Sequence, residues 1–217
     1  MTDFTALRTA MVDCQIRPSD VTKFPIIQAM LSVPREVFVP SAKREVAYAG
    51  GDILLGRNRV LMDPRVLAKM LDALGVSLGD LVLEIGCGLG YGTAVIAYLA
   101  EAVIAVEADE HLAAEAGDNL AAQSVDNAIV VQAAMENGAA KHGPYDKIVF
   151  SGGVEQVPAA ILEQLKEGGH VAAIFMQGVS GQCRVGVKTD GRVAWRNVFD
   201  ATVPVLPDFE KARQFAL

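Results

Sequence analysis

The sequence predicts an α/β fold, a Rossmann-like three-layer sandwich whose central sheet is mostly parallel. An apolar run, Leu81–Ile85, leads directly into three alternating glycines, and strand-like and helix-like segments alternate from Gly79 onward. Near the end, Asp190-Gly191 lies between two β-like segments, which predicts an antiparallel hairpin at one edge of the sheet. Residues 79–217 are therefore predicted to form the core, with residues 1–78 as a helical elaboration packed on it.

The first 78 residues combine helical patterns with prolines and glycines that interrupt them. Ser19 or Asp20 is well placed to cap a helix through Ile26–Leu31. Glycines at both ends of residues 50–56 indicate loops around a short apolar stretch. This part of the chain is therefore predicted to be helical and irregular.

The helix that precedes the core is marked at both ends. Asp63 suits the N-cap, Pro64 suits the first helical position, and apolar residues recur at helical spacing until Gly75. Beyond it, apolar runs of strand length alternate with helical segments, as in a parallel sheet. The predicted strands are Leu81–Ile85, Val103–Glu107, Ala128–Gln132, Tyr145–Phe150 and Val171–Met176, the helices are Thr93–Ala100, Glu110–Ala122 and Pro158–Lys166, and the hairpin strands are Gln182–Val187 and Val193–Val203.

Three glycines, Gly86, Gly88 and Gly90, follow the first core strand and can adopt backbone angles that side chains forbid. The chain can therefore turn sharply beneath a ligand. Glu107 ends the next predicted strand, 17 residues past Gly90. In a strand–turn–helix–strand unit this spacing places an acid where it accepts hydrogen bonds from both ribose hydroxyls. The pattern indicates a nucleoside site.

The spacing of the glycines argues against a dinucleotide. The fingerprint G-x-G-x-x-G needs glycine at Tyr91 or at Thr93, and both registers fail. What remains, with Glu84 two residues before the first glycine, resembles motif I of the class I S-adenosylmethionine-dependent methyltransferases. Glu84 is expected to reach the cofactor's cationic amino group, directly or through water; the plainer alternative is that the glycines serve packing alone. The predicted cofactor-binding residues are Glu84, Gly86, Cys87, Gly88, Gly90, Tyr91, Glu107, Ala108, Ala134 and Met135.

The composition narrows the range of partners. The net charge is −7, and no run of basic residues is longer than Lys43-Arg44, which disfavours a nucleic-acid substrate. Cys14, Cys87 and Cys183 are isolated and have no nearby histidine, so we predict reduced thiols and no metal site. The sequence contains neither a basic-then-apolar leader nor an apolar run of membrane-spanning length. A cytoplasmic protein without membrane association is predicted.

Three segments together resemble the protein-L-isoaspartate O-methyltransferase family: Gln15–Pro18, Ala29–Pro40 and Leu83–Ala94. The middle segment, Ala29–Pro40, distinguishes this family from other methyltransferases, because motif I itself is shared by many of them. The resemblance spans roughly residues 11–177. It implies S-adenosylmethionine as cofactor and methylation of the free carboxylate of isoaspartyl residues in damaged proteins or peptides. Because that carboxylate is already nucleophilic, positioning is expected to dominate over acid–base chemistry.

The sequence departs from the family's pattern at the methyl-acceptor site. Met62 stands where the family has a Ser or Thr hydroxyl, and methionine donates no strong hydrogen bond to a carboxylate. The neighbouring Asp63 is a second candidate, with a helix cap as its simpler interpretation. Ser151, after the fourth predicted strand, offers a hydroxyl, with an ordinary strand-end turn as its alternative. Met62, Asp63 and Ser151 are the candidate catalytic residues.

A second departure follows the third predicted strand, where Ala133-Ala134 replaces the family's Gly-Asp pair that contacts adenine. Glu136 or Asn137 is a candidate substitute contact, with a solvated loop side chain as the simpler interpretation, and Tyr91 is expected to pack or to shield the methionine portion of the cofactor. Three alternatives stay open: a different carboxylate or small-molecule acceptor, a non-catalytic cofactor-binding module and, more distantly, a nicotinamide oxidoreductase. The sequence leaves the oligomeric state open.

Overall fold

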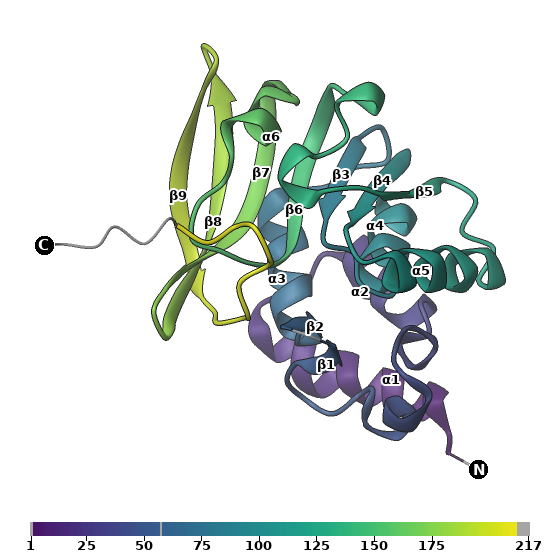
Figure 1. Ribbon diagram of the computed structural model, residues 1–217. Helices are drawn as coiled ribbons and strands as arrows, with labels where there is room; N and C mark the ends of the chain where they lie inside the picture. Colours follow the sequence, from purple (N-terminus) through teal and green to yellow (C-terminus); the bar gives the residue numbers. More distant parts are fainter. Residues whose placement is uncertain (1, 57, 212–217) are drawn as a thin grey trace, which may run out of the picture.

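The computed structural model describes residues 2–56 and 58–211 and shows a main sheet with helices packed against it (Figure 1). The described helices are α1 (Phe4–Met11), α2 (Phe24–Ser32), α3 (Pro64–Leu74), α4 (Tyr91–Leu99), α5 (Glu110–Ala122) and α6 (Ala159–Glu163). The strands are β1 (Ile53–Gly56), β2 (Arg59–Leu61), β3 (Leu81–Ile85), β4 (Ala102–Glu107), β5 (Ala128–Gln132), β6 (Tyr145–Val154), β7 (Leu165–Gln177), β8 (Ser180–Thr189) and β9 (Arg192–Asp200). Short π and 3-10 turns lie at Val12–Ile16, Arg17–Ser19, Arg35–Phe38, Ser41–Val46, Met135–Asn137 and Ala140–His142.

The main sheet has the strand order β5-β4-β3-β6-β7-β8-β9. Neighbouring strands from β5 to β7 pair in parallel, whereas β8 and β9 pair antiparallel at one edge. The β8–β9 turn contains Asp190 with φ 52° and Gly191 with φ 72°, as expected for a turn at an Asp-Gly pair. The predicted fold class, including the C-terminal hairpin, is therefore confirmed.

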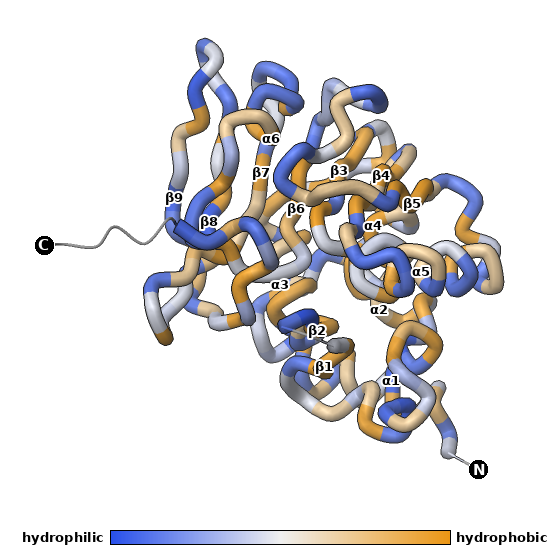
Figure 2. Tube along the Cα trace, viewed as in Figure 1, coloured by the Kyte–Doolittle hydropathy of each residue, from blue (hydrophilic) through white to orange (hydrophobic). Residues whose placement is uncertain are grey.

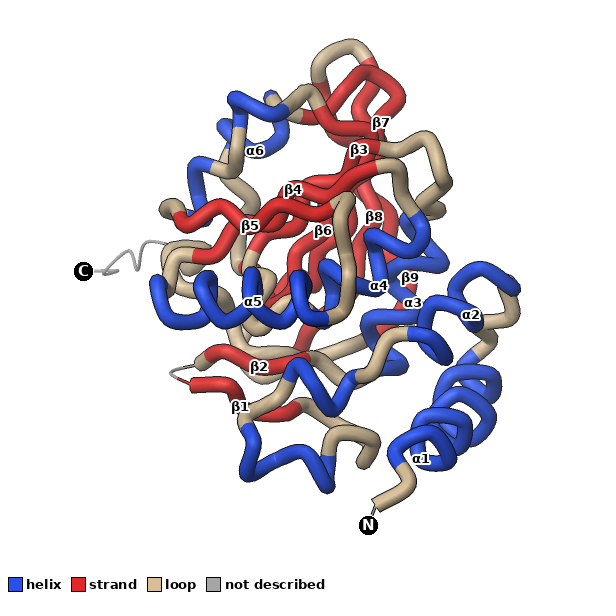
Figure 3. The backbone as a smooth tube through the Cα atoms, turned by 90° about the vertical axis from the view of Figure 1, so that its right-hand side faces the viewer, coloured by secondary structure: helices blue, strands red, loops and turns tan. Residues whose placement is uncertain are grey.

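Each face of the sheet has its own apolar core, because successive strand residues point to opposite faces. Val82, Val103 and Val149 pack with the N-terminal helices, α3 and α4, whereas Leu83 and Ile148 pack with α6 and the segment after β9. Figure 3 shows α4 and α5 on one side of the strands and α6 on the other. Figure 2 shows hydrophobic residues concentrated along the central strands. The division of the chain at residues 78 and 79 stays a prediction.

Helix α3 begins and ends as its sequence predicts. The Asp63 side chain accepts a 2.8 Å hydrogen bond from the Arg65 backbone N–H, and Pro64 occupies the first turn. Gly75 ends the helix with φ 66°, a left-handed conformation that glycine adopts without strain. Helix α3 thereby fixes the positions of Met62 and Asp63, which directly precede it. Among the described helices, none combines the length and apolar character that crossing a bilayer would require.

The predicted cap of the second helix is wrong. Helix α2 begins at Phe24, with Pro25 in its first turn and no side-chain cap. Proline has no N–H that needs a partner at this position, which lessens the need for a capping side chain. Asp20 instead adopts φ 66° and ends the preceding 3-10 turn.

Other boundaries also differ from prediction, and in β6 and β7 the reason is that strand pairing extends further than the apolar pattern. Strand β6 continues beyond Phe150 to Val154, which pairs with Phe175 of β7. The helix predicted to end at Lys166 ends at Glu163, and β7 already begins at Leu165. At the other end, β9 stops at Asp200 rather than Val203. Gly168 and Gly169 therefore lie inside β7.

Two segments cover the carboxyl end of the parallel strands. Figures 1 and 3 show β1 and β2 as a small hairpin below the main sheet, where the sequence indicates only loops. After β9 the chain returns across β6, where the Leu206 N–H donates a 2.9 Å hydrogen bond to the Gly153 carbonyl. Both segments approach the turn that follows β3. The hairpin and the returning segment together determine how much space remains above the turn after β3.

Candidate cofactor site

The turn after β3 has the backbone conformation that its glycines predict. Gly86, Gly88 and Gly90 have φ values of 81°, 57° and 94°, which side-chain-bearing residues rarely adopt. Gly90 is also the N-cap of α4. We call these glycines, together with Glu84 and Glu107, the cofactor cradle.

Glu107 lies at the carboxyl end of β4, as the spacing predicts, and the structure shows that it is fully buried. Its carboxylate accepts hydrogen bonds from the backbone N–H groups of Gly88 at 2.8 Å, Ala108 at 3.0 Å and Asp109 at 3.2 Å. The Gly88 bond joins the glycine turn to the tip of the next strand. The two halves of the predicted nucleoside site are therefore brought together.

An arginine that the sequence analysis did not predict occupies this carboxylate. Arg59 of β2 donates through Nη1 and Nη2 to the two oxygens of Glu107, and the Nη2 bond measures 2.7 Å. The side chains of Arg59 and Glu107 are 6% and 0% exposed. Such bidentate, charge-assisted pairs are the stronger kind of hydrogen bond. The predicted ribose acceptor is therefore already paired within the chain.

Glu84 is buried beneath the same turn. Its carboxylate accepts hydrogen bonds from the hydroxyls of Thr93 and Ser151. Burial raises the pKa of Glu84, and the two hydroxyl hydrogen bonds act in the opposite direction. A side chain at Gly92 would collide with this carboxylate, so the sequence around β3 leaves room for a buried acid. Glu84 lies in the cradle, although part of its acceptor capacity is used internally.

The three candidate catalytic residues have different surroundings. Met62 is buried, and its side chain lines a small cavity together with Glu84 and Ser151. Asp63 faces another way: it caps α3 and forms a 2.7 Å ion pair with Arg65. Burial raises the pKa of Asp63, but the Arg65 hydrogen bonds and charge outweigh it and hold that pKa below its usual value. The structure thus brings Met62 and Ser151 together and gives Asp63 the role of a helix cap.

Cys87 lies between the first two glycines and Tyr91 follows the third, and both residues are packed into the protein. The Tyr91 ring lies edge-on to Phe38 at 5.9 Å and beneath the Arg35 guanidinium at 4.9 Å. These contacts support its packing interpretation and direct the ring toward the N-terminal helices. Burial also raises the pKa of Cys87 well above the usual thiol value.

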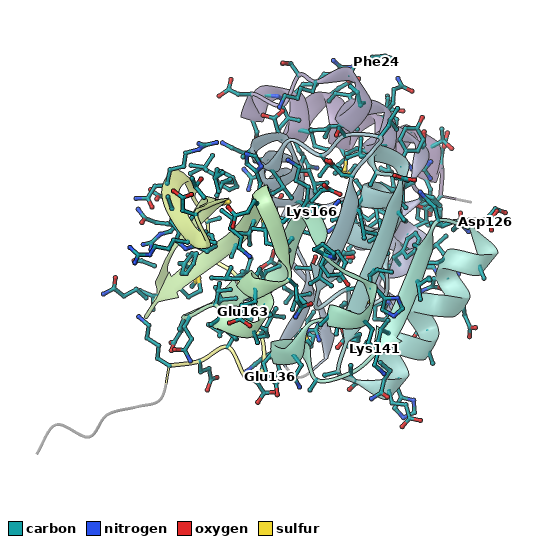
Figure 4. The ribbon with its side chains drawn as sticks, turned by 90° about the horizontal axis from the view of Figure 1, so that it is seen from above. Phe24, Asp126, Glu136, Lys141, Glu163 and Lys166 are labelled. Carbon is teal, nitrogen blue, oxygen red and sulfur yellow. The ribbon has the colours of Figure 1, made fainter. Side chains whose placement is uncertain are left out.

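The residues after β5 form the side of the cradle where an adenine contact is predicted. Met135 is buried, and its sulfur accepts a weak 3.9 Å hydrogen bond from Arg59. One carboxylate oxygen of Glu136 is buried without a hydrogen-bond partner in the described part of the chain. Figure 4 shows Glu136 at the periphery of the molecule. Ala134 is the N-cap of the 3-10 turn Met135–Asn137, and its side chain offers no polar contact.

The cradle has little open volume. The cavity lined by Met62, Glu84 and Ser151 has a volume of about 10 Å³, which is no more than one water molecule needs. A methyl group on Gly88 would lie 2.8 Å from Leu55 Cδ1, and one on Gly86 would lie 3.0 Å from Leu206 Cδ2. Side chains of the hairpin and of the C-terminal segment therefore fill the space above the glycines.

Sequence reasoning missed Arg59, Leu55 and Leu206 because all three reach the cradle only through long-range packing. One signal was present: Arg59 is a charged residue that directly precedes the apolar run Val60-Leu61-Met62. A charge in this setting points to a buried partner. Nothing in the local sequence identifies that partner as Glu107.

Comparisons with known proteins agree on one family. The family model described as protein-L-isoaspartate(D-aspartate) O-methyltransferase matches residues 8–202. Protein-L-isoaspartate O-methyltransferase 2 of Anaeromyxobacter sp. (strain Fw109-5) is 34% identical over 178 residues, which cover 82% of this chain and 72% of the relative. Protein-L-isoaspartate O-methyltransferase 1 of Rhodopseudomonas palustris (strain HaA2) is 36% identical over 170 residues, covering 78% and 69%.

Solved structures share the fold. One protein-L-isoaspartate O-methyltransferase superposes with a TM-score of 0.81 at 24% identity, covering 92% of this chain and 65% of that longer chain. A Plasmodium falciparum structure, described as a protein-L-isoaspartate O-methyltransferase in complex with S-adenosyl-L-homocysteine, gives a TM-score of 0.79 at 16% identity. This match covers 95% of this chain and 99% of the other.

Proposed function

The chain belongs to the protein-L-isoaspartate(D-aspartate) O-methyltransferase family, and we propose that it transfers a methyl group from S-adenosylmethionine to the carboxylate of isoaspartyl residues. The family match carries this proposal, because it spans the glycine turn, Glu107 and the segment around Met62. The methyl ester then closes to a succinimide, which allows the normal aspartyl linkage to reform. The reaction therefore repairs damaged proteins.

The polar groups of the cradle fit S-adenosylmethionine. Glu107 supplies paired carboxylate oxygens at the tip of β4, and the glycine turn lets the backbone approach a ligand. The unpartnered buried oxygen of Glu136 is a suitable acceptor for an exocyclic amine. Two of the side chains that fill the cradle, Arg59 and Leu55, come from the β1–β2 hairpin, and a third, Leu206, comes from the segment after β9. The donors and acceptors match the cofactor, and the hairpin and the segment after β9 determine how much room it has.

The chemistry makes few demands on the protein's side chains. The bound cofactor supplies an electrophilic methyl group on a cationic sulfur. A carboxylate oxygen of the acceptor forms the new C–O bond as the C–S bond breaks, and no proton needs to move. The protein's task is alignment, which contributes up to about 7–11 kcal/mol for well-oriented groups. The glycine turn after β3 and the Glu107 carboxylate at the tip of β4 serve this alignment on the cofactor's side.

The methyl-acceptor side of the site lacks a free hydroxyl donor among the residues that the structure describes. Met62 provides a buried thioether, and the Ser151 hydroxyl is bonded to Glu84. Neither group is free to donate a strong hydrogen bond to an acceptor carboxylate. This observation favours a second candidate function, methyl transfer to a different carboxylate or to a small molecule that suits an apolar wall.

A peptide methylation assay tests the proposal. Formation of S-adenosyl-L-homocysteine should depend on isoaspartyl peptides and be absent with matched aspartyl peptides. A Met62→Ser variant, which restores a hydroxyl, should equal or exceed the wild-type rate. No turnover by either protein with isoaspartyl peptides, alongside turnover with a cell extract, would favour the second candidate. Cofactor binding without turnover on any acceptor would instead indicate a non-catalytic module.

The proposal places this activity in the cytoplasm, with isoaspartyl-bearing proteins or peptides as the partners and without nucleic-acid or membrane partners. Cys14, Cys87 and Cys183 are free thiols, which supports a reducing compartment. The acidic net charge of −7 supports the absence of nucleic-acid binding.

A further inference from the structure

The hairpin over the cradle is structurally separate from the main sheet. Strands β1 and β2 pair with each other, and in the described residues neither pairs with another strand. A two-stranded hairpin is marginally stable by itself in water. Its outer surface is open, since Leu54 is 54% exposed. The position of the hairpin therefore depends on the contacts at its base and on its inner side.

The base of the hairpin is firmly anchored. Arg35 is completely buried and donates 2.8 Å hydrogen bonds to the Ala47 carbonyl, before β1, and to the Met62 carbonyl, after β2. The Asp52 carboxylate also accepts a 2.7 Å hydrogen bond from the Asp63 N–H. One buried guanidinium thus ties both ends of the hairpin to the protein. Movement of β1 and β2 would pivot about this base.

The inner side is held by the pair that blocks the cradle. Glu107 accepts two hydrogen bonds from Arg59 and three from backbone N–H groups, so both carboxylate oxygens are saturated. A ribose cannot bond to these oxygens while Arg59 holds them. Removing Arg59 alone leaves the carboxylate with its three backbone donors, at Gly88, Ala108 and Asp109. Glu107 is therefore equipped to exchange one partner for another.

We propose that Arg59 is an internal competitor of the cofactor: it holds Glu107 in the cofactor-free protein, and S-adenosylmethionine binds only after β1 and β2 move away and release this carboxylate. The inference rests on the proposed function, because it takes S-adenosylmethionine as the ligand of the cradle. Movement of the hairpin also withdraws Leu55 from above Gly88. The apparent affinity then equals the intrinsic affinity multiplied by the fraction of molecules in the open state.

A competitor that acts only on the free protein has a distinctive signature. Weakening the Arg59–Glu107 pair increases the open fraction and therefore the association rate, while the dissociation rate of the bound cofactor stays unchanged. The gain is also the same for cationic S-adenosylmethionine and for S-adenosyl-L-homocysteine, because Arg59 has left Glu107 in both complexes. An arginine that contacted the cofactor would distinguish the two ligands by their charge.

The test compares Arg59→Met and Arg59→Lys with the wild type, using calorimetric titration for affinity and stopped-flow mixing for rates. We expect Arg59→Met to bind both ligands at least about tenfold more tightly, which corresponds to about 1.4 kcal/mol. Arg59→Lys should give a smaller gain, since lysine keeps the charge without the bidentate geometry. Arg17→Met is the matched control, because it removes an exposed arginine paired with Asp13. Its affinity should equal that of the wild type.

Urea unfolding of each variant establishes whether it is folded. If Arg59→Met is unfolded, the comparison of Arg59→Lys with the wild type tests the proposal. Unchanged or weaker cofactor affinity in a folded Arg59 variant would overturn the proposal. Tighter binding of only one of the two ligands, or a faster dissociation rate, would overturn it as well. Binding by Arg59→Met but not by the wild type would support it, whereas binding by neither would contradict it. Turnover of isoaspartyl peptides with unchanged Arg59→Met affinity would contradict the competitor role alone. Tighter binding without such turnover would contradict the substrate assignment alone.

Discussion

Replacing Arg35 by methionine should lower the free energy of unfolding by about 3–5 kcal/mol. Arg35 is fully buried and bridges the carbonyls of Ala47 and Met62, which are also in buried residues. Methionine keeps much of the side chain's length but leaves both carbonyls without a donor. A hydrogen bond to a charged group contributes about 1.5–3 kcal/mol, and the stacking of Arg35 on Tyr91 adds to the loss.

One consequence of removing Arg35 partly offsets this loss of stability. Burial lowers the pKa of Arg35, and its Nη1 has no hydrogen-bond partner in the described part of the chain, so removing the charge relieves some desolvation. The expected loss is therefore smaller than the sum of the individual contacts. It is still a large part of the stability of an ordinary domain.

Urea unfolding at neutral pH, followed by circular dichroism, measures this loss. Arg35→Lys should be intermediate, because an ammonium can reach one of the two carbonyls but does not span both as the planar guanidinium does. Arg17→Met serves as the surface control and should change stability by less than about 0.5 kcal/mol. If Arg35→Met unfolds within about 0.5 kcal/mol of the wild type, the two carbonyl contacts do not hold the hairpin base as inferred.

Three further predictions concern the cradle and its surroundings. Burial raises the pKa of Glu84, so the folded protein binds this proton more tightly than the unfolded chain, and its contribution to stability falls as the pH rises. The stability of the wild type relative to Glu84→Gln should therefore increase as the pH is lowered through the raised pKa, and urea titrations giving a constant difference would contradict this. Asp63→Ala should cost about 1–2 kcal/mol of stability through loss of the helix cap, with Asp63→Asn recovering most of it; equal losses in the two variants would argue against capping. In the Arg59→Met background, Glu107→Ala should weaken S-adenosylmethionine binding by about 1.5–3 kcal/mol, because charged hydrogen bonds to the ribose are lost. Titration showing unchanged affinity would remove Glu107 from the site.

Local signals were enough for much of the fold. The strands Leu81–Ile85 and Ala128–Gln132 and the helix Glu110–Ala122 have the predicted boundaries, because their apolar spacing and end residues agree. Prediction failed where pairing with a distant strand decided the conformation. The segment around Leu165 reads as a helix end but joins the sheet opposite Tyr145. Residues 151–154 likewise continue a strand although their glycines suggest a turn.

The site shows the same division between local and long-range information. The spacing from Gly90 to Glu107 is fixed along the chain, because a helix of limited length must return to the neighbouring parallel strand. That spacing was sufficient to bring the acid beside the glycine turn, where Gly88 now donates to it. The role of Asp63 as a helix cap was also predictable from the sequence, whereas the burial of Met62 was found only in the structure. The pairing of Arg59 with the Glu107 carboxylate was not predictable from the local sequence.

By itself, the sequence determined the α/β fold, the glycine turn and the acid at the next strand tip, because these depend on backbone freedom and on periodicity over short distances. The tertiary structure alone decided that Arg59 meets Glu107 across 48 residues and that Leu206 returns over Gly86. Such contacts depend on which surfaces fold against each other, and a buried charge takes whichever partner that packing supplies. The state of the cradle was therefore set by tertiary packing.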